Sequence, residues 1–233
     1  MAQLQTSRAV RGEVDELRSG DRMTREEFHR IYERMPEDFK AELVGGIVYV
    51  ASPLRVGHGT AHSVLNAALA MYMSATPGVE AGDNVTVLLS DDSEPQPDLF
   101  LRILPKYGGQ SKTTKGDYLQ GPPELLAEIA YSSRAIDLHA KRDIYARYGV
   151  LEYLVLSLKE RELKWFDLRA NKELAADSDG VCRVHAFPGL WIHVEAILQR
   201  NYQQLMAMLK QGLESPEHAD FVAKLASAHK PRG

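Results

Sequence analysis

The chain has 233 residues, of which 44% are hydrophobic and 26% are charged, the composition of an ordinary globular protein. Its formal net charge of −4 argues against a protein that coats nucleic acid through its overall charge, although it leaves room for a local basic patch. Cys182 is the only cysteine, so an intrachain disulfide and a four-cysteine zinc site are both excluded.

Residues 1–22 are polar and mixed in charge, and they predict an N-terminal arm ahead of a folded domain at residues 23–198. Residues 199–233 predict a C-terminal helical extension. The arm lacks the apolar core of a signal peptide, and no apolar stretch approaches the roughly 18 residues that a transmembrane helix needs. We therefore expect a cytoplasmic protein.

The first regular elements follow directly after the arm. Thr24 and Glu27 have the spacing of a capping box, which predicts that a helix begins there. The segment "AELVGGIVYVAS" predicts two short strands joined at Gly45–Gly46, a hairpin signal. Residues 60–74 place apolar side chains at helical spacing, and they predict a largely buried helix.

Two strand-like segments come next, at residues 79–90 and 97–103. Residues 104–123 are rich in Gly, Lys, Thr and Pro, and they predict an unusually long loop. Loops of that length tend to be functional or mobile. Residues 124–133 form a short, strand-like apolar run with one charge inside it.

Residues 135–148 predict a helix that ends at Gly149, and residues 151–169 predict a β-hairpin that turns near Lys159–Glu160. A weak strand is expected at residues 181–187. The order of helix, strands, helix, strands and helix favours a mixed α/β or α+β fold.

From Val194 to its end the chain looks helical. Apolar residues recur there at roughly helical spacing, namely Ile197, Leu198, Leu205, Leu209 and Leu213. This stripe predicts a surface that docks on the rest of the protein or, alternatively, makes a dimer.

Two carboxylates stand in unusual places, inside strand-like apolar runs. Asp98 stands in "PQPDLFLR", and Glu128 lies within "ELLAEIAY". If the two strands are neighbours, alternation of side chains could bring both carboxylates to one point. Like charges held together need a cation between them, and hard oxygen ligands select magnesium or manganese. Such a metal activates water for attack on a phosphodiester.

Glu42 is a third candidate ligand, and Lys141 could stabilise charge on a phosphate. Each of these residues also has a structural interpretation. Glu42 could be an exposed charge on an edge strand, and Asp98 could cap a turn. Lys141 lies four residues after Asp137, the spacing of a surface ion pair on a helix.

Five blocks of the sequence, in this order and spacing, resemble the Uma-two family: "ELVGGIVYVAS", "EPQPDLFLRI", "GPPELLAEIAYSS", "DLHAKRDIYARYGVLEYLV" and "FPGLW". This family belongs to the PD-(D/E)XK nuclease superfamily, and the resemblance covers roughly residues 23–198. It implies a restriction-endonuclease-like fold, in which helices flank a central mixed β-sheet and the active site lies at the strand ends.

The resemblance also implies the site residues. Pro97–Asp98 matches the family's Pro-Asp step, whose aspartate is a metal ligand. Glu128 matches the acid of the second motif, and Glu42 matches the acidic position of the early block. The superfamily's lysine usually stands two residues after the second acid, where this chain has Ala130. Lys141, in the following helix, is the matching position in this family.

We therefore expect a Mg²⁺- or Mn²⁺-dependent nuclease in which Asp98, Glu128 and Glu42 hold the metal and Lys141 orients water or stabilises the phosphate. DNA is the expected substrate. A homodimer is expected because restriction-endonuclease-like folds often act on both strands of a duplex. The alternative is a catalytically inactive binding or scaffold module, which the net negative charge and the displaced lysine motivate.

One further motif is discounted. His58 and His62 in "HGTAH" have the spacing of zinc-protease ligands, but that motif needs a glutamate where this chain has Gly59. Both histidines are interpreted as packed or solvent-facing, although the helix that bears them could bring His62 near the site.

Overall fold

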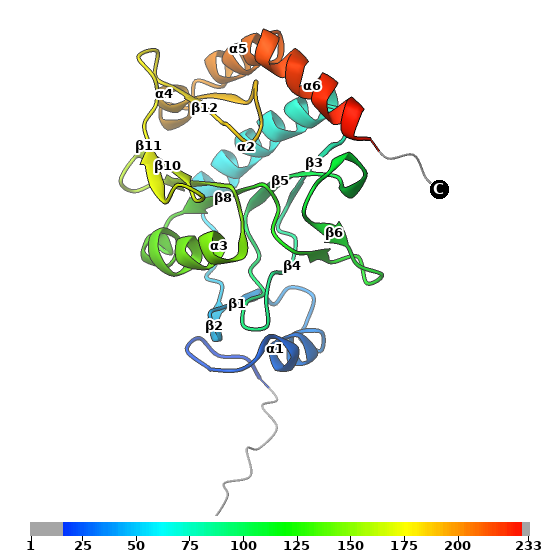
Figure 1. Cartoon of the computed structure of the whole chain (residues 1–233). Helices are drawn as coiled ribbons and strands as arrows, with labels where there is room; N and C mark the ends of the chain where they lie inside the picture. Colours follow the sequence, from blue (N-terminus) through cyan, green and yellow to red (C-terminus); the bar gives the residue numbers. More distant parts are fainter. Residues whose placement is uncertain (1–15, 230–233) are drawn as a thin grey trace, which may run out of the picture.

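A central six-stranded sheet organises the protein (Figure 1). The computed structural model describes residues 16–229, so most of the predicted N-terminal arm, residues 1–15, lies outside the described residues. The strands of this sheet, in spatial order, are β11 (Lys172–Leu174), β10 (Glu162–Asp167), β9 (Glu152–Ser157), β8 (Leu125–Ala130), β5 (Leu99–Ile103) and β3 (Val79–Asp83). Strands β8 and β9 are parallel, and the other neighbours are antiparallel. The expected mixed sheet flanked by helices is confirmed.

The two faces of the sheet pack against different helices, because successive strand residues point to opposite faces. Leu99, Leu125 and Leu154 share a core with the helix α2 (Val56–Ala75). Their neighbours Phe100, Leu126 and Tyr153 share a second core with the helix α3 (Arg142–Tyr148). Figure 1 shows these two helices on either side of the central strands. Burial of each large apolar side chain contributes about 1.5–3 kcal/mol.

The N-terminal part follows the sequence-based expectations closely. The helix α1 (Arg25–Tyr32) begins after Thr24, whose hydroxyl accepts a hydrogen bond from the Glu27 N–H at 3.2 Å. Strands β1 (Ala41–Val44) and β2 (Ile47–Val50) pair as an antiparallel hairpin. Gly45 and Gly46 have φ values of 58° and 76°, the left-handed conformation that a two-residue hairpin turn requires. This hairpin carries Glu42.

Between β2 and β8 the structure departs from expectation in three places. Helix α2 begins at Val56 rather than near residue 60. Residues 79–90 form two strands, because a turn at Asn84, with φ of 51°, separates β3 from β4 (Val87–Leu88).

The expected long loop at residues 104–123 is largely irregular, but short regular elements interrupt it. It contains a 3₁₀ turn (Pro105–Tyr107) and two short strands, β6 (Lys112–Thr113) and β7 (Leu119–Gln120). These strands form a three-stranded sheet with β4. Strands of two residues are too short to leave a periodic pattern, so only their partners reveal them.

The predicted helix at residues 135–148 has two parts. Its first part, Ile136–Lys141, is a π-helix, and α3 continues it to a left-handed Gly149 with φ of 94°. The β-hairpin of β9 and β10 is confirmed. Single π-helical turns occur frequently at functional sites.

The C-terminal region adds strands β12 (Val181–Arg183) and β13 (Trp191–His193) and the helices α4 (Val194–Leu198), α5 (Tyr202–Leu213) and α6 (Pro216–Ala228). The apolar stripe of this region packs inside the protein: Leu205 and Leu209 are buried in the same core as α2. The domain boundary at residue 198 stays a prediction. Within residues 16–229, no helix has both the length and the apolar character to cross a bilayer.

Two helical glycines provide a matched test of this packing. A methyl group added at Gly212 in α5 would collide with the carbonyl oxygen of Gly189 and with the Trp191 ring, whereas one added at Gly59 in α2 would meet no atom within 4 Å. We expect Gly212→Ala to lower the free energy of unfolding by about 1–3 kcal/mol. Gly59→Ala should raise it by about 0.5–1 kcal/mol. Urea unfolding followed by circular dichroism measures both, and equal effects would contradict the observed packing of α5.

Candidate active site

The strand register brings the two sequence-selected carboxylates together. Strands β5 and β8 pair Leu99 with Ala127 and Phe100 with Leu126, and continuing this register places Asp98 opposite Glu128. The Asp98 N–H lies 3.4 Å from Glu128 Oε2. On the neighbouring strand, the Ile129 N–H donates a hydrogen bond to Asp98 Oδ2 at 2.6 Å. The expectation that the two carboxylates meet therefore agrees with the geometry.

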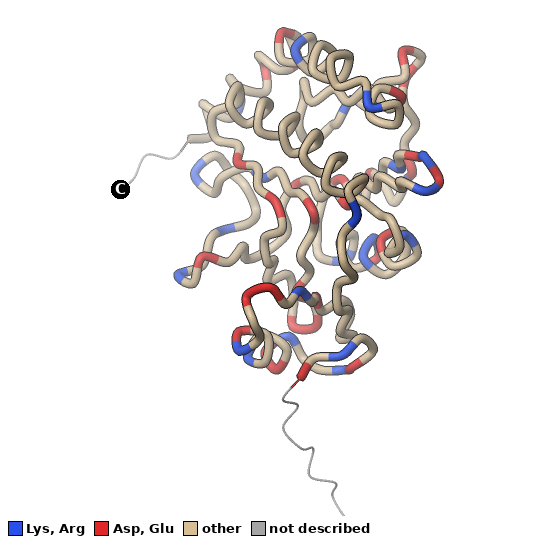
Figure 2. Tube along the Cα trace, turned by 180° about the vertical axis from the view of Figure 1, so that it is seen from behind, with Lys and Arg blue, Asp and Glu red and all other residues tan. Residues whose placement is uncertain are grey.

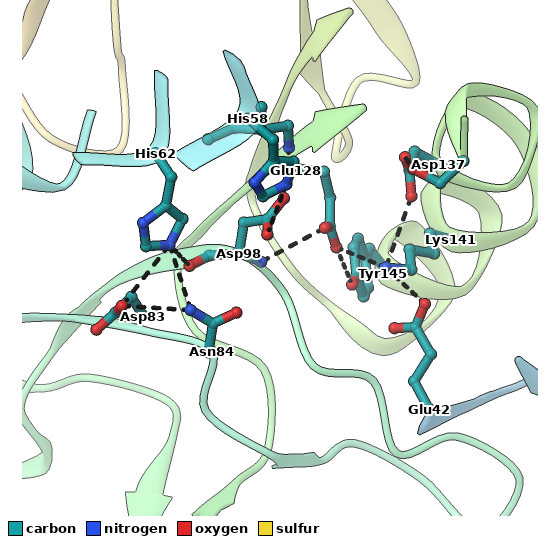
Figure 3. A network of polar contacts seen from close by, with 12 residues as sticks. Glu42, His58, His62, Asp83, Asn84, Asp98, Glu128, Asp137, Lys141 and Tyr145 are labelled. Carbon is teal, nitrogen blue, oxygen red and sulfur yellow. Dashed lines mark hydrogen bonds and ion pairs between the residues drawn. The ribbon is translucent and has the colours of Figure 1, made fainter. Parts of the chain in front are cut away.

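Lys141 lies at the centre of a buried cluster of carboxylates (Figure 3). Its Nζ is 3.0 Å from Glu128 Oε1 and 2.9 Å from Glu42 Oε1. Asp137 Oδ1 lies 3.6 Å away. The side chains of Asp137 and Lys141 are only 2% and 5% exposed, so the interpretation of this pair as a surface ion pair is wrong. The i, i+4 spacing instead places Asp137 and Lys141 together in a buried cluster.

Two side chains that the sequence analysis did not select complete this side of the cluster. The hydroxyl of Tyr145 donates to Glu128 Oε1 at 3.0 Å. The hydroxyl of Ser133 donates to Asp137 Oδ2 at 2.6 Å. Tyr145 stands four residues after Lys141 and therefore on the same helix face, a spacing that could have revealed it.

His58 and His62 approach Asp98 from the opposite side, from α2 (Figure 3). His58 Nε2 lies 3.4 Å from Asp98 Oδ1, and His62 Nε2 lies 3.1 Å from the Asp98 carbonyl oxygen. The hydrogen bond to Asp98 raises the pKa of His58. The sequence predicts a packed or solvent-facing His58, and His58 is indeed buried, but its contact with Asp98 arises only from the packing of α2.

The electrostatic balance of the cluster is negative. Burial raises the pKa of Glu128 well above its ordinary value of 4.5, while the ammonium of Lys141 opposes that shift. Burial also raises the pKa of Asp137. For Lys141, burial lowers the pKa, but the surrounding carboxylates raise it well above its ordinary value overall. The three carboxylates of Glu42, Glu128 and Asp137 thus share one ammonium, an arrangement that favours an additional cation.

The carboxylate oxygens of Asp98 and Glu128 that have few partners suit the coordination of a magnesium ion. Among the described residues, Glu128 Oε2 has only the long contact to the Asp98 N–H, and Asp98 Oδ1 has only the 3.4 Å contact to His58. Within residues 16–229, no group of three or more His, Cys, Asp or Glu side chains is arranged to hold a metal. Two carboxylates with the remaining positions left to water and substrate phosphate are a common magnesium arrangement. The donors therefore fit the ion.

Glu42 has a different set of contacts from the other two predicted metal ligands. Its Oε1 faces Lys141, and its Oε2 accepts a hydrogen bond from the Gln96 N–H at 3.3 Å. Its role as a metal ligand stays a prediction.

Other buried glutamates show what a purely structural role looks like in this protein. Glu124 accepts hydrogen bonds from the Ile103 and Gln110 N–H groups at 2.8 and 3.1 Å. Glu152 accepts from the Trp165 indole and the Ala186 N–H. The carboxylates of Glu124 and Glu152 connect loops to the sheet by accepting hydrogen bonds from neutral N–H groups. Glu128 differs because it contacts the Lys141 ammonium and lies near further acids.

Comparison with known proteins gives a consistent result. The family model described as "Uma2: Putative restriction endonuclease" matches residues 25–195. Among solved structures, the crystal structure of a "putative nuclease belonging to DUF820" from Anabaena variabilis ATCC 29413 is similar, with a TM-score of 0.57 and 12% sequence identity. The match covers 76% of this chain and 98% of that chain, and it shows a shared fold. No curated protein matches the sequence.

The buried cluster predicts a strong and pH-dependent effect of Lys141→Met. Removing the ammonium leaves buried carboxylates without their cation, which should lower the free energy of unfolding by about 3–5 kcal/mol at pH 7 in metal-free buffer. A carboxyl group whose pKa is raised by folding binds its proton more tightly in the folded state. The stability of the protein therefore falls as the pH rises from the unfolded-state pKa to the higher folded-state pKa. The loss of stability in Lys141→Met should therefore become smaller as the pH falls towards 4.5, the ordinary pKa of the Glu128 carboxyl group.

Urea unfolding at several pH values measures this effect. The double variant Lys141→Met/Glu128→Gln should be more stable at pH 7 than Lys141→Met alone, because one uncompensated charge has been removed. A deficit that is independent of pH in the single variant would contradict the electrostatic explanation.

Proposed function

The chain belongs to the Uma2 family, and from this premise we propose that it is a divalent-metal-dependent nuclease that hydrolyses phosphodiester bonds, with DNA as the expected substrate. The observation that supports this proposal most directly is the pairing of Asp98 and Glu128 across neighbouring strands, beside a buried excess of negative charge. Magnesium or manganese is the expected cofactor, and Asp98 and Glu128 would hold it. When bound, such an ion polarises water and neutralises charge on the phosphate.

The protein side chains would prepare this site in distinct ways. The Lys141 ammonium favours the ionised form of Glu128 against the effect of burial, and Tyr145 holds Glu128 Oε1, so that Oε2 is directed towards Asp98. The Ile129 N–H and His58 fix the two oxygens of Asp98. Each of these contacts reduces the freedom of a carboxylate before substrate arrives, and such preorganisation is a main source of electrostatic catalysis.

Lys141 is proposed as the counterpart of the superfamily's lysine. Ala130, at the usual position of that lysine, is fully buried in the core beside α3, so a lysine there would have no route to solvent. Lys141 reaches Glu128 from the π-helix instead. We expect its ammonium to stabilise phosphate charge, or to orient the attacking water, once substrate is bound.

A binding or scaffold module without cleavage is the second candidate function. It is favoured by one observation: the Lys141 ammonium already contacts Glu128 and Glu42, which leaves less negative charge for a metal. A homodimer and a cytoplasmic location also remain predictions. Light scattering of the full chain, with and without duplex DNA, tests the dimer.

Titration of Mn²⁺ by calorimetry tests the metal site without assuming a substrate. We expect the wild type to bind Mn²⁺ and the isosteric double variant Asp98→Asn/Glu128→Gln to lose binding, because amides are poor ligands for this ion. Asp91→Asn, an exposed carboxylate on a loop, removes one charge elsewhere and should bind Mn²⁺ like the wild type. Equal binding by the wild type and the double variant would place the metal elsewhere.

Cleavage distinguishes the two candidate functions. With Mg²⁺ or Mn²⁺, the wild type should degrade single-stranded or duplex DNA in a fluorescence assay, and Asp98→Asn should reduce the rate by about 100-fold or more, as expected for loss of a metal ligand. Asp91→Asn serves again as the control. Binding of DNA without metal, together with no cleavage under any metal condition, would favour the binding module.

A further inference from the structure

A cleft of about 530 Å³ opens next to the candidate active site. It is bounded by α2, the end of β8, the β9–β10 hairpin and the turn between α4 and α5. Gly57 and Ala61 of α2 line it, on either side of His58 in the sequence, and Tyr131 lines it three residues after Glu128. The volume lies in the range that small ligands occupy. The cleft thus shares two elements with the carboxylate site, although neither Asp98 nor Glu128 lines it.

The walls of the cleft carry positive charge and no acidic residue. Arg161 and Arg200 line it, and within residues 16–229 neither guanidinium forms an ion pair with a carboxylate. At its edge, Arg55 and Lys159 lie 4.9 and 4.8 Å from the centre of the Tyr131 ring. Elsewhere, residues of both signs are interspersed along the chain (Figure 2). The cleft is therefore a local site for an anion in a protein of net negative charge.

Both arginines adopt an unusual backbone conformation. Arg161 has φ of 52° and Arg200 has φ of 61°, in the left-handed region that glycine adopts without strain and that other residues rarely occupy. Local stability alone would favour glycine at these two turns. Backbone strain of this kind often occurs where a side chain is needed for binding. It also means that glycine can replace either arginine without disturbing the turn.

The remaining lining residues suit a flat, partly apolar ligand. Leu156, Ile197 and Tyr202 provide apolar and aromatic surface, and the Gln199 side chain offers both a donor and an acceptor. Arginines bind phosphate through paired N–H groups. Together these groups match a nucleotide, with its base against the apolar wall and its phosphate at the arginines.

We propose that this cleft binds one unpaired nucleotide of the substrate strand, so that the protein prefers single-stranded or locally unpaired DNA to intact duplex. The proposal rests on the nuclease function proposed above. Tyr131 follows Glu128 by three residues, about 10 Å along an extended chain, so a strand held in the cleft would continue past the carboxylate pair. An unpaired base can reach such a cleft and pack on apolar and aromatic side chains, whereas a base within a duplex is shielded by its stack.

The first experiment measures binding by fluorescence anisotropy with the full chain in EDTA, so that it requires neither metal nor cleavage. The probes are a labelled single strand of about 12 nucleotides and the matched duplex, since sites for single strands span roughly 4–16 nucleotides. We expect the wild type to bind the single strand about tenfold more tightly. Arg161→Gly/Arg200→Gly should lose most of this affinity and reduce the magnitude of the slope of log affinity against log salt by about 0.7, the contribution of the one phosphate that the two arginines share.

The control variant Lys210→Ala/Lys224→Ala removes the same charge from exposed positions on α5 and α6 that do not line the cleft. It should bind the single strand like the wild type. Thermal unfolding should show that Arg161→Gly/Arg200→Gly is at least as stable as the wild type, because glycine suits both turns. Tyr202→Ala should weaken single-strand binding about tenfold, as loss of one stacked base predicts.

Three outcomes would overturn the proposal. They are equal affinity of the wild type for the single strand and the duplex, unchanged single-strand affinity in the arginine variant, and a loss of affinity in the lysine control as large as in the arginine variant. Competition by adenosine monophosphate as strong as that by the oligonucleotide would also overturn it, because the cleft would then be a site for free nucleotides. The arginine variant should still bind Mn²⁺ like the wild type. Failure of the nuclease proposal would instead appear as absent Mn²⁺ binding or cleavage, with strand binding preserved.

Discussion

The burial of several carboxylates around a single ammonium is the constraint on which the rest of the site depends. Lys141 lies 5% exposed between Glu42 and Glu128, and Asp137 is nearly as deeply buried. Removing such charges from water is costly, and proteins tolerate it where geometry and hydrogen bonds compensate. Here the compensation comes from Lys141, Tyr145 and Ser133. Carboxyl groups still outnumber the ammonium, which supports the proposed cation site.

Three separate parts of the fold meet at this cluster. The hairpin of β1 and β2 supplies Glu42, the central sheet supplies Asp98 and Glu128, and the π-helical segment before α3 supplies Asp137 and Lys141. Helix α2 closes the opposite side with His58 and His62. Most of these side chains lie on helices and strands packed against the sheet, and Asp98 directly precedes β5. Rigid support of this kind is what electrostatic preorganisation requires.

On the proposals above, the cleft next to the cluster would contribute to substrate recognition. A chain with a formal net charge of −4 cannot attract nucleic acid by its overall charge. The proposed recognition of nucleic acid would then depend on local groups, and the arginines and lysine around Tyr131 are such a group beside the strand that carries Glu128. The carboxylate pair would hold a metal that acts on the phosphodiester. The cleft would select a strand whose bases are accessible.

Local signals in the sequence determined much of the fold and part of the site. The helix cap at Thr24, the glycine turn at Gly45–Gly46 and the β9–β10 hairpin depend on neighbours within a few residues, and the structure contains all three. The isolated carboxylates Asp98 and Glu128 were visible because charges are rare in apolar strands. What only the tertiary structure decided depends on contacts between distant segments. The two-residue strands β6 and β7, the approach of His58 to Asp98, and the insertion of Lys141 between Glu42 and Glu128 all arise from packing that no local pattern encodes.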